Sequence, residues 1–259
     1  MIDIHSHILP NLDDGARDLG EAVEMARMAA SDGITHMTVT PHMYNGLSHN
    51  PEPDEIRVRV ESLQREIGDI LKLLPGNEVH IAHDIAEKAS EGRLTPLNHK
   101  NYMLIELPSM SVPVGVEALF YRLQVQGITP ILVHPERNSE LQRHPSRVAE
   151  FVEKGVRIQV TAMSLTGDFG KAALTTAERL LRHNCVHFLA TDTHRANRRP
   201  PILSAGRDAA AKIVGEESAR KMVEDHPLAV IQGVRFDAGE PVPFVRPKSG
   251  RLLSRFFKR

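Results

Sequence analysis

Histidine and carboxylate side chains recur along the chain, each at or near the end of a short β-rich segment. They are His5, His7, His42, Glu78, Glu106, His134, Asp192 and His194. Neutral imidazoles and carboxylates, without thiolates, suit borderline and hard divalent ions such as zinc, manganese or iron. A catalytic zinc usually keeps about three protein ligands and one open position. The set is therefore too large for one ion and predicts a site for more than one.

The opening stretch MIDIHSHILPNLDDG shows how spacing supports this interpretation. Side chains alternate between the two faces of a strand, so His5 and His7 point to the same side. An H-x-H pair alone is a weak signal, because such pairs also arise by chance. The later histidines and the two isolated glutamates, all near strand ends, argue against coincidence.

Short β-rich segments alternate with helical patterns. We expect strands at residues 2–5, 35–40, 78–82, 102–107, 129–134, 157–161 and 187–191. Apolar residues at helical spacing predict helices over 19–33, 116–127 and 147–155, each ending at a glycine. Repeated strand-helix-strand units indicate right-handed crossovers and a parallel sheet, as a barrel or as an open doubly wound sheet.

The polar residues distinguish these two architectures. The carboxyl ends of barrel strands converge on one mouth, where barrel active sites form. Glu78 is the exception, because it lies near the start of its segment, so this strand either begins earlier or is irregular. No Gly-rich phosphate loop occurs, which counts against nucleotide binding. We therefore predict a single-domain α/β barrel.

Composition excludes several other classes. The chain has 259 residues, 41% of them hydrophobic and 25% charged, with a net charge of −1. A partner nucleic acid usually requires a basic excess, so nucleic acid is disfavoured. The sequence shows no signal-peptide pattern and no apolar run of about 20 residues. The single cysteine permits no internal disulfide, which suits the cytoplasm.

A series of motifs resembles a known superfamily. The motifs are H-x-H, D-D-G, P-H, G-N-E, I-E-L, H-P-E-R, T-D-T-H and R-P-P, in this order between His5 and Pro201. Their order and spacing resemble the polymerase and histidinol phosphatase (PHP) superfamily, and most closely the manganese-dependent protein-tyrosine phosphatases of bacterial capsule and exopolysaccharide loci. The resemblance spans residues 1–233. It implies a distorted (β/α)7 barrel of PHP type with three metal ions.

The resemblance also implies which residues hold each ion. The first site would use His5, His7, Glu78 and Asp192; the second Glu78 as a bridge with Glu106 and His134; the third Asp14, His42 and His194. Related phosphatases often have histidine where this chain has Asp14 and Glu106. The additional carboxylates make the cluster harder, which favours manganese, with zinc or iron as alternatives.

The implied reaction is hydrolysis of a phosphate monoester. Clustered cations neutralise the phosphate oxygens and lower the pKa of a bound water. Arg137 and Arg199 occupy family positions that imply contact with the remaining phosphate oxygens, and Asp14 is assigned to the catalytic set as well as to the ligands. The implied substrate is a phosphotyrosine protein, namely the tyrosine-rich tail of a bacterial capsule-type kinase.

Three alternatives stay open at this point. Another phosphoesterase of the superfamily would act on histidinol phosphate, another small phosphomonoester or a nucleic acid end. An amidohydrolase would bridge its metals with a modified lysine on a middle strand, where this chain offers Glu106. A metal-stabilised scaffold without catalysis is the third, although structural zinc sites are mostly closed and cysteine-rich.

Other polar residues have structural interpretations. Asp3 could support an imidazole, Asp13 could shape the D-D-G turn, and Arg17 with Asp18 could open the first helix. Cys185 is not expected to be a phosphatase nucleophile, because a C-x5-R loop would require arginine at the position of Thr191, and it is expected in the core. Nine histidines are expected at the surface or as satisfied core residues: His36, His49, His80, His83, His99, His144, His183, His187 and His226.

The chain is expected to end in a separate tail. Residues 1–246 would form the barrel, and residues 247–259, PKSGRLLSRFFKR, interleave basic and apolar side chains. Such a segment could form an amphipathic helix on the inner membrane surface near a membrane kinase. A frayed tail or a subunit contact in an oligomer is the alternative.

Overall fold

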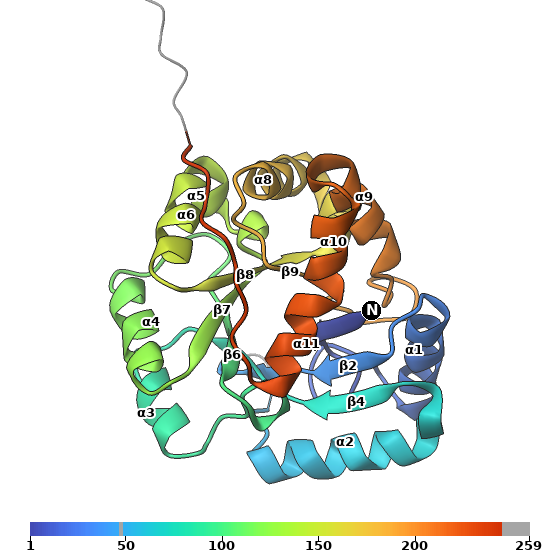
Figure 1. The fold of residues 1–259 in the computed structure, drawn as a ribbon. Coiled ribbons are helices and arrows are strands. Elements are labelled where there is room, and N and C mark those ends of the chain that lie inside the picture. The colour runs from blue at the N-terminus through green and yellow to red at the C-terminus, as the bar shows by residue number, and fades with distance from the viewer. Residues whose placement is uncertain (47–48, 245–259) are drawn as a thin grey trace, which may run out of the picture.

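The computed structural model describes residues 1–46 and 49–244, and its strands form a parallel barrel surrounded by helices (Figure 1). The strands are β1 (Ile2–Ser6), β2 (His36–Val39), β3 (His42–Met43), β4 (Lys72–Pro75), β5 (Glu78–His80), β6 (Tyr102–Glu106), β7 (Thr129–Val133), β8 (Arg157–Thr161) and β9 (Phe188–Ala190). Their order is β1-β2-β4 in one sheet and β3-β5-β6-β7-β8-β9 in the other. A parallel bridge between Ser6 and Thr193 joins β1 to the segment after β9.

Two strand positions of the barrel are broken. Thr40 and Pro41 separate β2 from β3, and Gly76 and Asn77 separate β4 from β5. Proline has no N–H to donate to a ladder, so Pro41 favours the first break. A Cβ atom at Gly76 would lie 2.8 Å from the Leu97 side chain and 3.0 Å from that of Thr38, so a larger residue at the second break would require its neighbours to move. If each broken pair counts as one position, the barrel has seven, which confirms the predicted (β/α)7 architecture.

The predicted strands agree with those observed to within one or two residues at their ends. The irregularity expected at Glu78 is explained, because its strand begins at Lys72 and is interrupted just before Glu78. The sequence interpretation missed β4 and the short β3, and it placed no strand between residues 40 and 78.

The helices lie around the barrel. They are α1 (Leu19–Ser31), α2 (Pro53–Ile67), α3 (Ile85–Ser90), α4 (Val116–Val125), α5 (Ser139–Arg143), α6 (Ser146–Glu153), α7 (Ala162–Thr166), α8 (Gly170–Arg182), α9 (Ser204–Val214), α10 (Glu216–Val223) and α11 (Asp225–Gln232), with 3-10 turns η1 (Gly68–Ile70), η2 (Leu97–His99) and η3 (Pro135–Arg137). The three predicted helices are confirmed as α1, α4 and α6. Asp18 caps α1 by accepting a hydrogen bond from Glu21 N at 2.9 Å, as expected.

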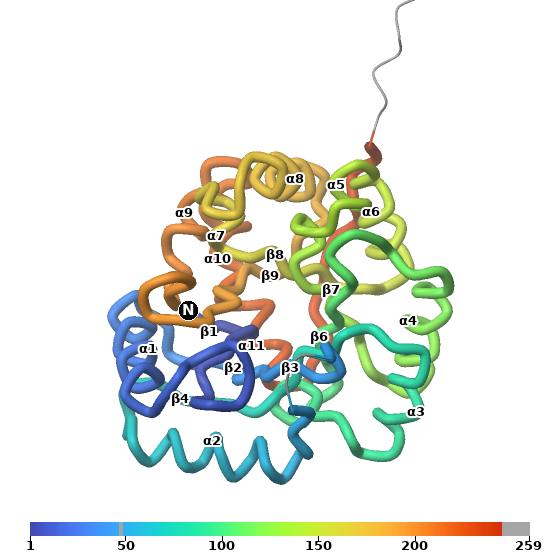
Figure 2. The backbone as a smooth tube through the Cα atoms, turned by 180° about the vertical axis from the view of Figure 1, so that it is seen from behind, coloured from blue at the N-terminus to red at the C-terminus, as the bar shows by residue number. Residues whose placement is uncertain are grey.

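The core has two layers, and the inner one closes one end of the barrel. The inner layer lies inside the barrel. It includes the first residues of three strands, Ile2, Tyr102 and Phe188, together with Val230 and Ile231 of α11. Figure 1 shows α11 across this end. The outer layer packs the helices against the strands. Figure 2 shows the barrel from the opposite side.

Two further expectations concern the membrane. Across residues 1–46 and 49–244, no helix combines the length and apolar character needed to cross a bilayer. The tail at 247–259, for which a contact with the membrane surface was considered, lies outside the described residues.

Candidate metal centre

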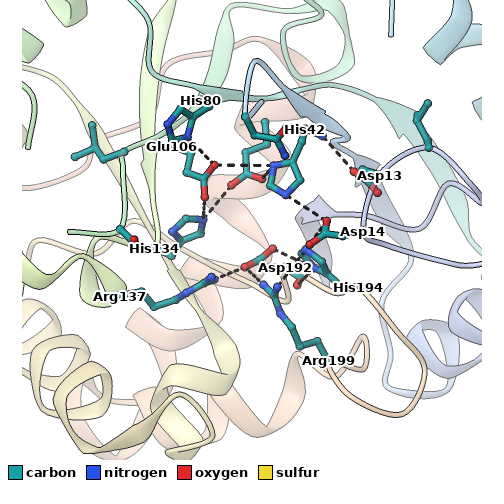
Figure 3. A pocket seen from close by; sticks show the side chains of 15 residues that line it. Asp13, Asp14, His42, His80, Glu106, His134, Arg137, Asp192, His194 and Arg199 are labelled. Atoms are coloured by element: carbon teal, nitrogen blue, oxygen red, sulfur yellow. Dashed lines mark hydrogen bonds and ion pairs between the residues drawn. The ribbon is translucent and has the colours of Figure 1, made fainter. Parts of the chain in front are cut away.

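The structure gathers all nine predicted ligand residues at the open end of the barrel. Seven of them line a pocket of about 560 Å³, namely Asp14, His42, Glu78, Glu106, His134, Asp192 and His194. His5 and His7 lie buried beside them. Figure 3 shows the pocket, with Arg137 and Arg199 on one side of it.

The first predicted group is compact. The Nε2 atom of His5 lies 3.3 Å from Glu78 Oε1 and 3.4 Å from Asp192 Oδ1. The Nε2 atom of His7 lies 3.3 Å from Glu78 Oε2 and 3.5 Å from Asp192 Oδ1. The four side chains are almost completely buried. Two imidazole nitrogens and two carboxylates therefore converge on one small volume.

The second and third predicted groups overlap with the first. His134 Nε2 lies 2.9 Å from Glu78 Oε1 and 3.9 Å from Glu106 Oε1. Asp14 Oδ1 lies 3.4 Å from His42 Nε2 and 3.3 Å from His194 Nε2. The ligand atoms fall within 4.8 Å of one another in four sets: His7, Asp14, His42 and His194; His5, His134 and Asp192; His5, His7 and Glu78; His42, Glu78 and Glu106.

These sets differ from the implied ones in three assignments. His7 groups with Asp14, His42 and His194 as well as with His5 and Glu78. His42 groups with Glu78 and Glu106 as well as with Asp14, because its Nδ1 lies 2.8 Å from Glu78 Oε2. His134 groups with His5 and Asp192. Glu78 and these imidazoles thus connect neighbouring cation positions.

Several atoms in the centre fit a cation and little else. The Nδ1 atoms of His5 and His7 lie 3.0 Å from Gln159 Oε1 and 2.7 Å from Asp13 Oδ2, so both can donate to these oxygens and offer Nε2 to a cation once any competing proton has left. These two Nε2 atoms lie only 3.3 Å apart. His42 Nδ1 and Glu78 Oε2 are both buried, and apart from each other, at 2.8 Å, they have no hydrogen-bond partner among the described residues. Facing imidazole nitrogens and a buried carboxylate oxygen are stabilised by a positive ion.

Sequence reasoning missed two of the residues that orient these side chains. Gln159 lies on β8 and accepts from His5, and His80 Nδ1 lies 3.1 Å from Glu106 Oε2. His80 was expected among the surface or core histidines, yet it lines the pocket. Asp13 orients His7 and also accepts from Gly15 N at 3.0 Å, so its predicted role in the turn is confirmed but incomplete.

Asp3 does not support an imidazole, as the sequence had suggested. Its buried carboxylate accepts from the Thr191 hydroxyl and from Thr191 N at 3.1 Å, and burial raises its pKa to about 6. The next residue, Asp192, has φ 50, and His134 has φ 35. A left-handed conformation is costly for residues other than glycine and occurs often at functional sites. Asp3 therefore holds the backbone that carries Asp192.

The charges of the centre are strongly coupled. Burial opposes ionisation of Glu78, but the His5 and His42 imidazoles outweigh it and hold the pKa of Glu78 well below its usual range. Burial and His7 oppose protonation of His42, but the Glu78 and Asp14 carboxylates raise its pKa to about 10. Burial likewise opposes protonation of His7, and Asp13 raises its pKa well above the usual value.

These pKa shifts predict proton release when a metal binds. With a pKa of about 10, both ring nitrogens of His42 carry a proton at neutral pH. A cation that binds to this imidazole must displace one of the two protons. We expect the affinity of chelator-treated protein for Mn²⁺ to rise between about pH 6 and about pH 8, since fewer protons compete. Calorimetry in buffers of different ionisation enthalpy would measure the protons released. Binding without proton release and without pH dependence would contradict the prediction.

Loss of the Gln159 acceptor should weaken the centre. Gln159→Leu keeps the size of the side chain but leaves His5 Nδ1 without its partner. We expect metal affinity to fall about 10- to 100-fold, as for other residues that orient metal ligands. Metal titration followed by equilibrium dialysis would measure it. Gln124→Leu, which removes a surface amide that donates to Lys154 O, is the control and should leave affinity unchanged.

The two arginines lie beside the ligands. Arg137 Nη1 donates to Asp192 Oδ2 at 2.5 Å, and Arg199 Nη2 donates to the same oxygen. Arg199 also lies 3.1 Å from His194 Nε2 through Nη1. A guanidinium has five N–H donors, so both retain donors that can face an anion in the pocket.

Cys185 is excluded as the nucleophile. Its thiol is buried in the core, as predicted, and burial raises its pKa to about 12. A thiol with such a pKa is almost entirely protonated at neutral pH. The chemistry of the molecule is concentrated in the polar pocket.

A parallel α/β barrel with overlapping clusters of imidazoles and carboxylates at its open end defines the class of metal-dependent barrel hydrolases. The family model for capsular polysaccharide synthesis, CpsB/CapC, matches residues 1–232. The chain belongs to this family, which places it in the PHP superfamily as its motifs had implied.

Relatives with established names support this assignment. The chain is 43% identical over 202 residues to the tyrosine-protein phosphatase YwqE of Bacillus subtilis, covering 77% of this chain and 79% of the relative. It is 28% identical over 238 residues to the tyrosine-protein phosphatase CpsB of Streptococcus pneumoniae, covering 89% and 98%. A chain from the crystal structures of YwqE and CpsB, described as metal-dependent tyrosine phosphatases, matches with a TM-score of 0.90 and 36% identity, over 95% of this chain and 100% of that one.

Proposed function

We propose that this chain is a metal-dependent protein-tyrosine phosphatase that uses the described pocket. The observation that carries the proposal is the overlap of four candidate ligand sets with two arginines in one cavity. A phosphate monoester needs this combination, because both its ground state and its transition state carry negative charge. The names of the relatives agree with this chemistry.

Three ions are proposed, held by His5, His7, Asp14, His42, Glu78, Glu106, His134, Asp192 and His194. When bound, divalent cations would supply an activated water and neutralise the phosphate oxygens. The four carboxylates of the set favour manganese, with zinc or iron as alternatives. The sets contain no thiolate, which argues against a structural zinc site and so against a non-catalytic scaffold.

The side chains of the pocket have separate tasks in this mechanism. Arg137 and Arg199 grip the phosphate oxygens with planar N–H donors and hold the phosphorus in line with the attacking oxygen. Asp14 lies at the rim, where its carboxylate is 66% exposed. Partial desolvation opposes its ionisation, but hydrogen bonds from His194 and His42 hold the pKa of Asp14 below the usual range. Asp14 is therefore ionised at neutral pH, which suits a metal ligand and does not suit a general acid.

The substrate is proposed to be a phosphotyrosine protein, with a bacterial tyrosine kinase of a capsule or exopolysaccharide locus as the partner. A cytoplasmic location suits this partner and the single buried cysteine. We keep residues 1–246 as the catalytic barrel and residues 247–259 as a tail that could contact the membrane surface or a second subunit.

The decisive test compares substrates. We expect the protein purified with Mn²⁺ to hydrolyse a phosphotyrosine peptide with a kcat/KM at least about tenfold above that for histidinol phosphate. Both are phosphomonoesters, so the comparison holds the reaction constant and varies the leaving group. A large preference for histidinol phosphate would replace the proposal by the alternative, a histidinol phosphatase or another small-phosphomonoester phosphatase.

A further inference from the structure

A second hollow adjoins the metal pocket and is rich in arginine. It has a volume of about 840 Å³ and shares Asp14, His194 and Arg199 with the metal pocket. The remaining lining residues are Arg17, Met163, Asp168, Phe169, Arg195, Asn197 and Arg198. The hollow thus carries four arginines against two aspartates, and one of these, Asp14, already belongs to the metal centre.

Two of the arginines are available to an incoming anion. Arg17 is engaged by Glu21, with Nε 2.9 Å from Oε2, and Arg199 by Asp192. Within residues 1–46 and 49–244, no carboxylate lies within ion-pair distance of Arg195 or Arg198. Four arginines face only two aspartates in this hollow, so an anion next to Arg195 and Arg198 is electrostatically favourable.

The backbone fixes these arginines in place. Arg195 and Arg199 form an antiparallel bridge, and Arg199 O accepts from Thr193 Oγ1 at 2.7 Å and from His194 N at 3.1 Å. The loop is therefore a tight turn, and its hydrogen bonds start directly beside the metal centre. The backbone that carries Arg195 and Arg198 is thus fixed next to the metal centre.

Phe169, on another wall of the hollow, contacts the two arginines proposed to bind the phosphate. The Phe169 ring, between α7 and α8, lies 4.6 Å from the Arg137 guanidinium and 5.4 Å from that of Arg199. Met163 adds a second apolar side chain. A residue next to the phosphotyrosine would thus meet an apolar wall on one side and unpaired arginines on the other.

We propose that this hollow is a subsite for an anionic side chain on the same peptide as the phosphotyrosine. The inference rests on the proposed phosphatase function and extends it to substrate choice. With the phosphate at the metal centre, an extended chain advances about 3.3 Å per residue and reaches the adjoining hollow within a few positions. Arginine clusters bind carboxylate and phosphate groups by the same charged hydrogen bonds, so the ligand is a carboxylate or a second phosphate.

The test uses three phosphotyrosine peptides and one small aryl phosphate as the reference. The peptides carry alanine, aspartate or a second phosphotyrosine at the flanking positions. For wild type we expect kcat/KM relative to the aryl phosphate to be about five- to tenfold higher for the anionic peptides than for the alanine peptide. The double variant Arg195→Ala/Arg198→Ala should lose this preference, and Arg195→Lys/Arg198→Lys should regain part of it.

Controls and outcomes separate the subsite from the function itself. Arg65→Ala/Arg93→Ala changes net charge equally at exposed positions outside the hollow and should keep the preference. A loss for both anionic peptides supports a general anion subsite, and a loss for the doubly phosphorylated peptide alone supports a phosphate subsite. No preference in wild type, or a preference retained in the Arg195→Ala/Arg198→Ala variant, overturns the inference. If wild type cleaves the aryl phosphate and none of the peptides, the proposed protein-tyrosine phosphatase function fails, and the subsite proposal falls with it.

Discussion

Replacing His134 with alanine is expected to lower kcat/KM for a phosphotyrosine peptide on the order of a thousandfold and to reduce the bound metal. His134 Nε2 lies 2.9 Å from Glu78 Oε1, and its imidazole shares a ligand set with His5 and Asp192. Loss of this imidazole would remove one ligand from a bound cation. The cation would then bind less tightly and neutralise the phosphate oxygens less well. Metal analysis and peptide hydrolysis on the same preparation would measure both effects.

The backbone at His134 requires a second variant. His134 has φ 35, and asparagine tolerates this conformation better than alanine. His134→Asn should therefore fold at least as well as His134→Ala and still lose activity. His144→Ala, which removes an exposed imidazole outside the pocket, is the matched control. A metal-free His134→Ala protein with undiminished activity would overturn the proposed mechanism.

The sequence was informative about the metal centre because parallel strands impose a simple geometry. Residues at the carboxyl ends of parallel strands must meet at one mouth, so Glu106, His134 and Asp192 could be placed together without coordinates. The same argument failed to place Glu78 within its strand, because the strand is interrupted at Gly76 and Asn77, just before Glu78. Leu97 and Thr38 approach Gly76 closely from distant parts of the chain, so the local sequence does not show how little room is left there.

Other features depend on contacts between segments far apart in the chain. Gln159 and His80 look like ordinary strand residues until β8 and β5 bring them beside His5 and Glu106. The left-handed conformations of His134 and Asp192 also need long-range support, such as the hydrogen bond from His134 N to Gln159 O at 2.8 Å. In contrast, α2 could have been predicted, since Ile56, Val60, Leu63 and Ile67 follow helical spacing and are buried.

Arg137 and Arg199, the arginines proposed to bind the phosphate, present a different problem, because each could serve the metal centre or the phosphate. Both donate to Asp192 Oδ2, and Asp192 has a pKa well below its usual range because His5 and Arg199 outweigh the effect of burial. Removing one arginine leaves the other in contact with Asp192. The carboxylate therefore keeps a positive partner, and the cations should stay bound.

Arg199→Ala is accordingly expected to lower kcat/KM for phosphotyrosine peptide about a hundredfold or more while the metal content stays near that of wild type. Arg199→Lys should recover only part of the loss, because an ammonium cannot present two parallel donors to a phosphate. Arg65→Ala, at an exposed position on α2, controls for the change in charge. If Arg137 and Arg199 grip the same phosphate, the double variant should lose less than the product of the single losses. A fall in metal content that matches the fall in rate would instead assign Arg199 to support of Asp192, and the phosphate would then depend on Arg137 alone.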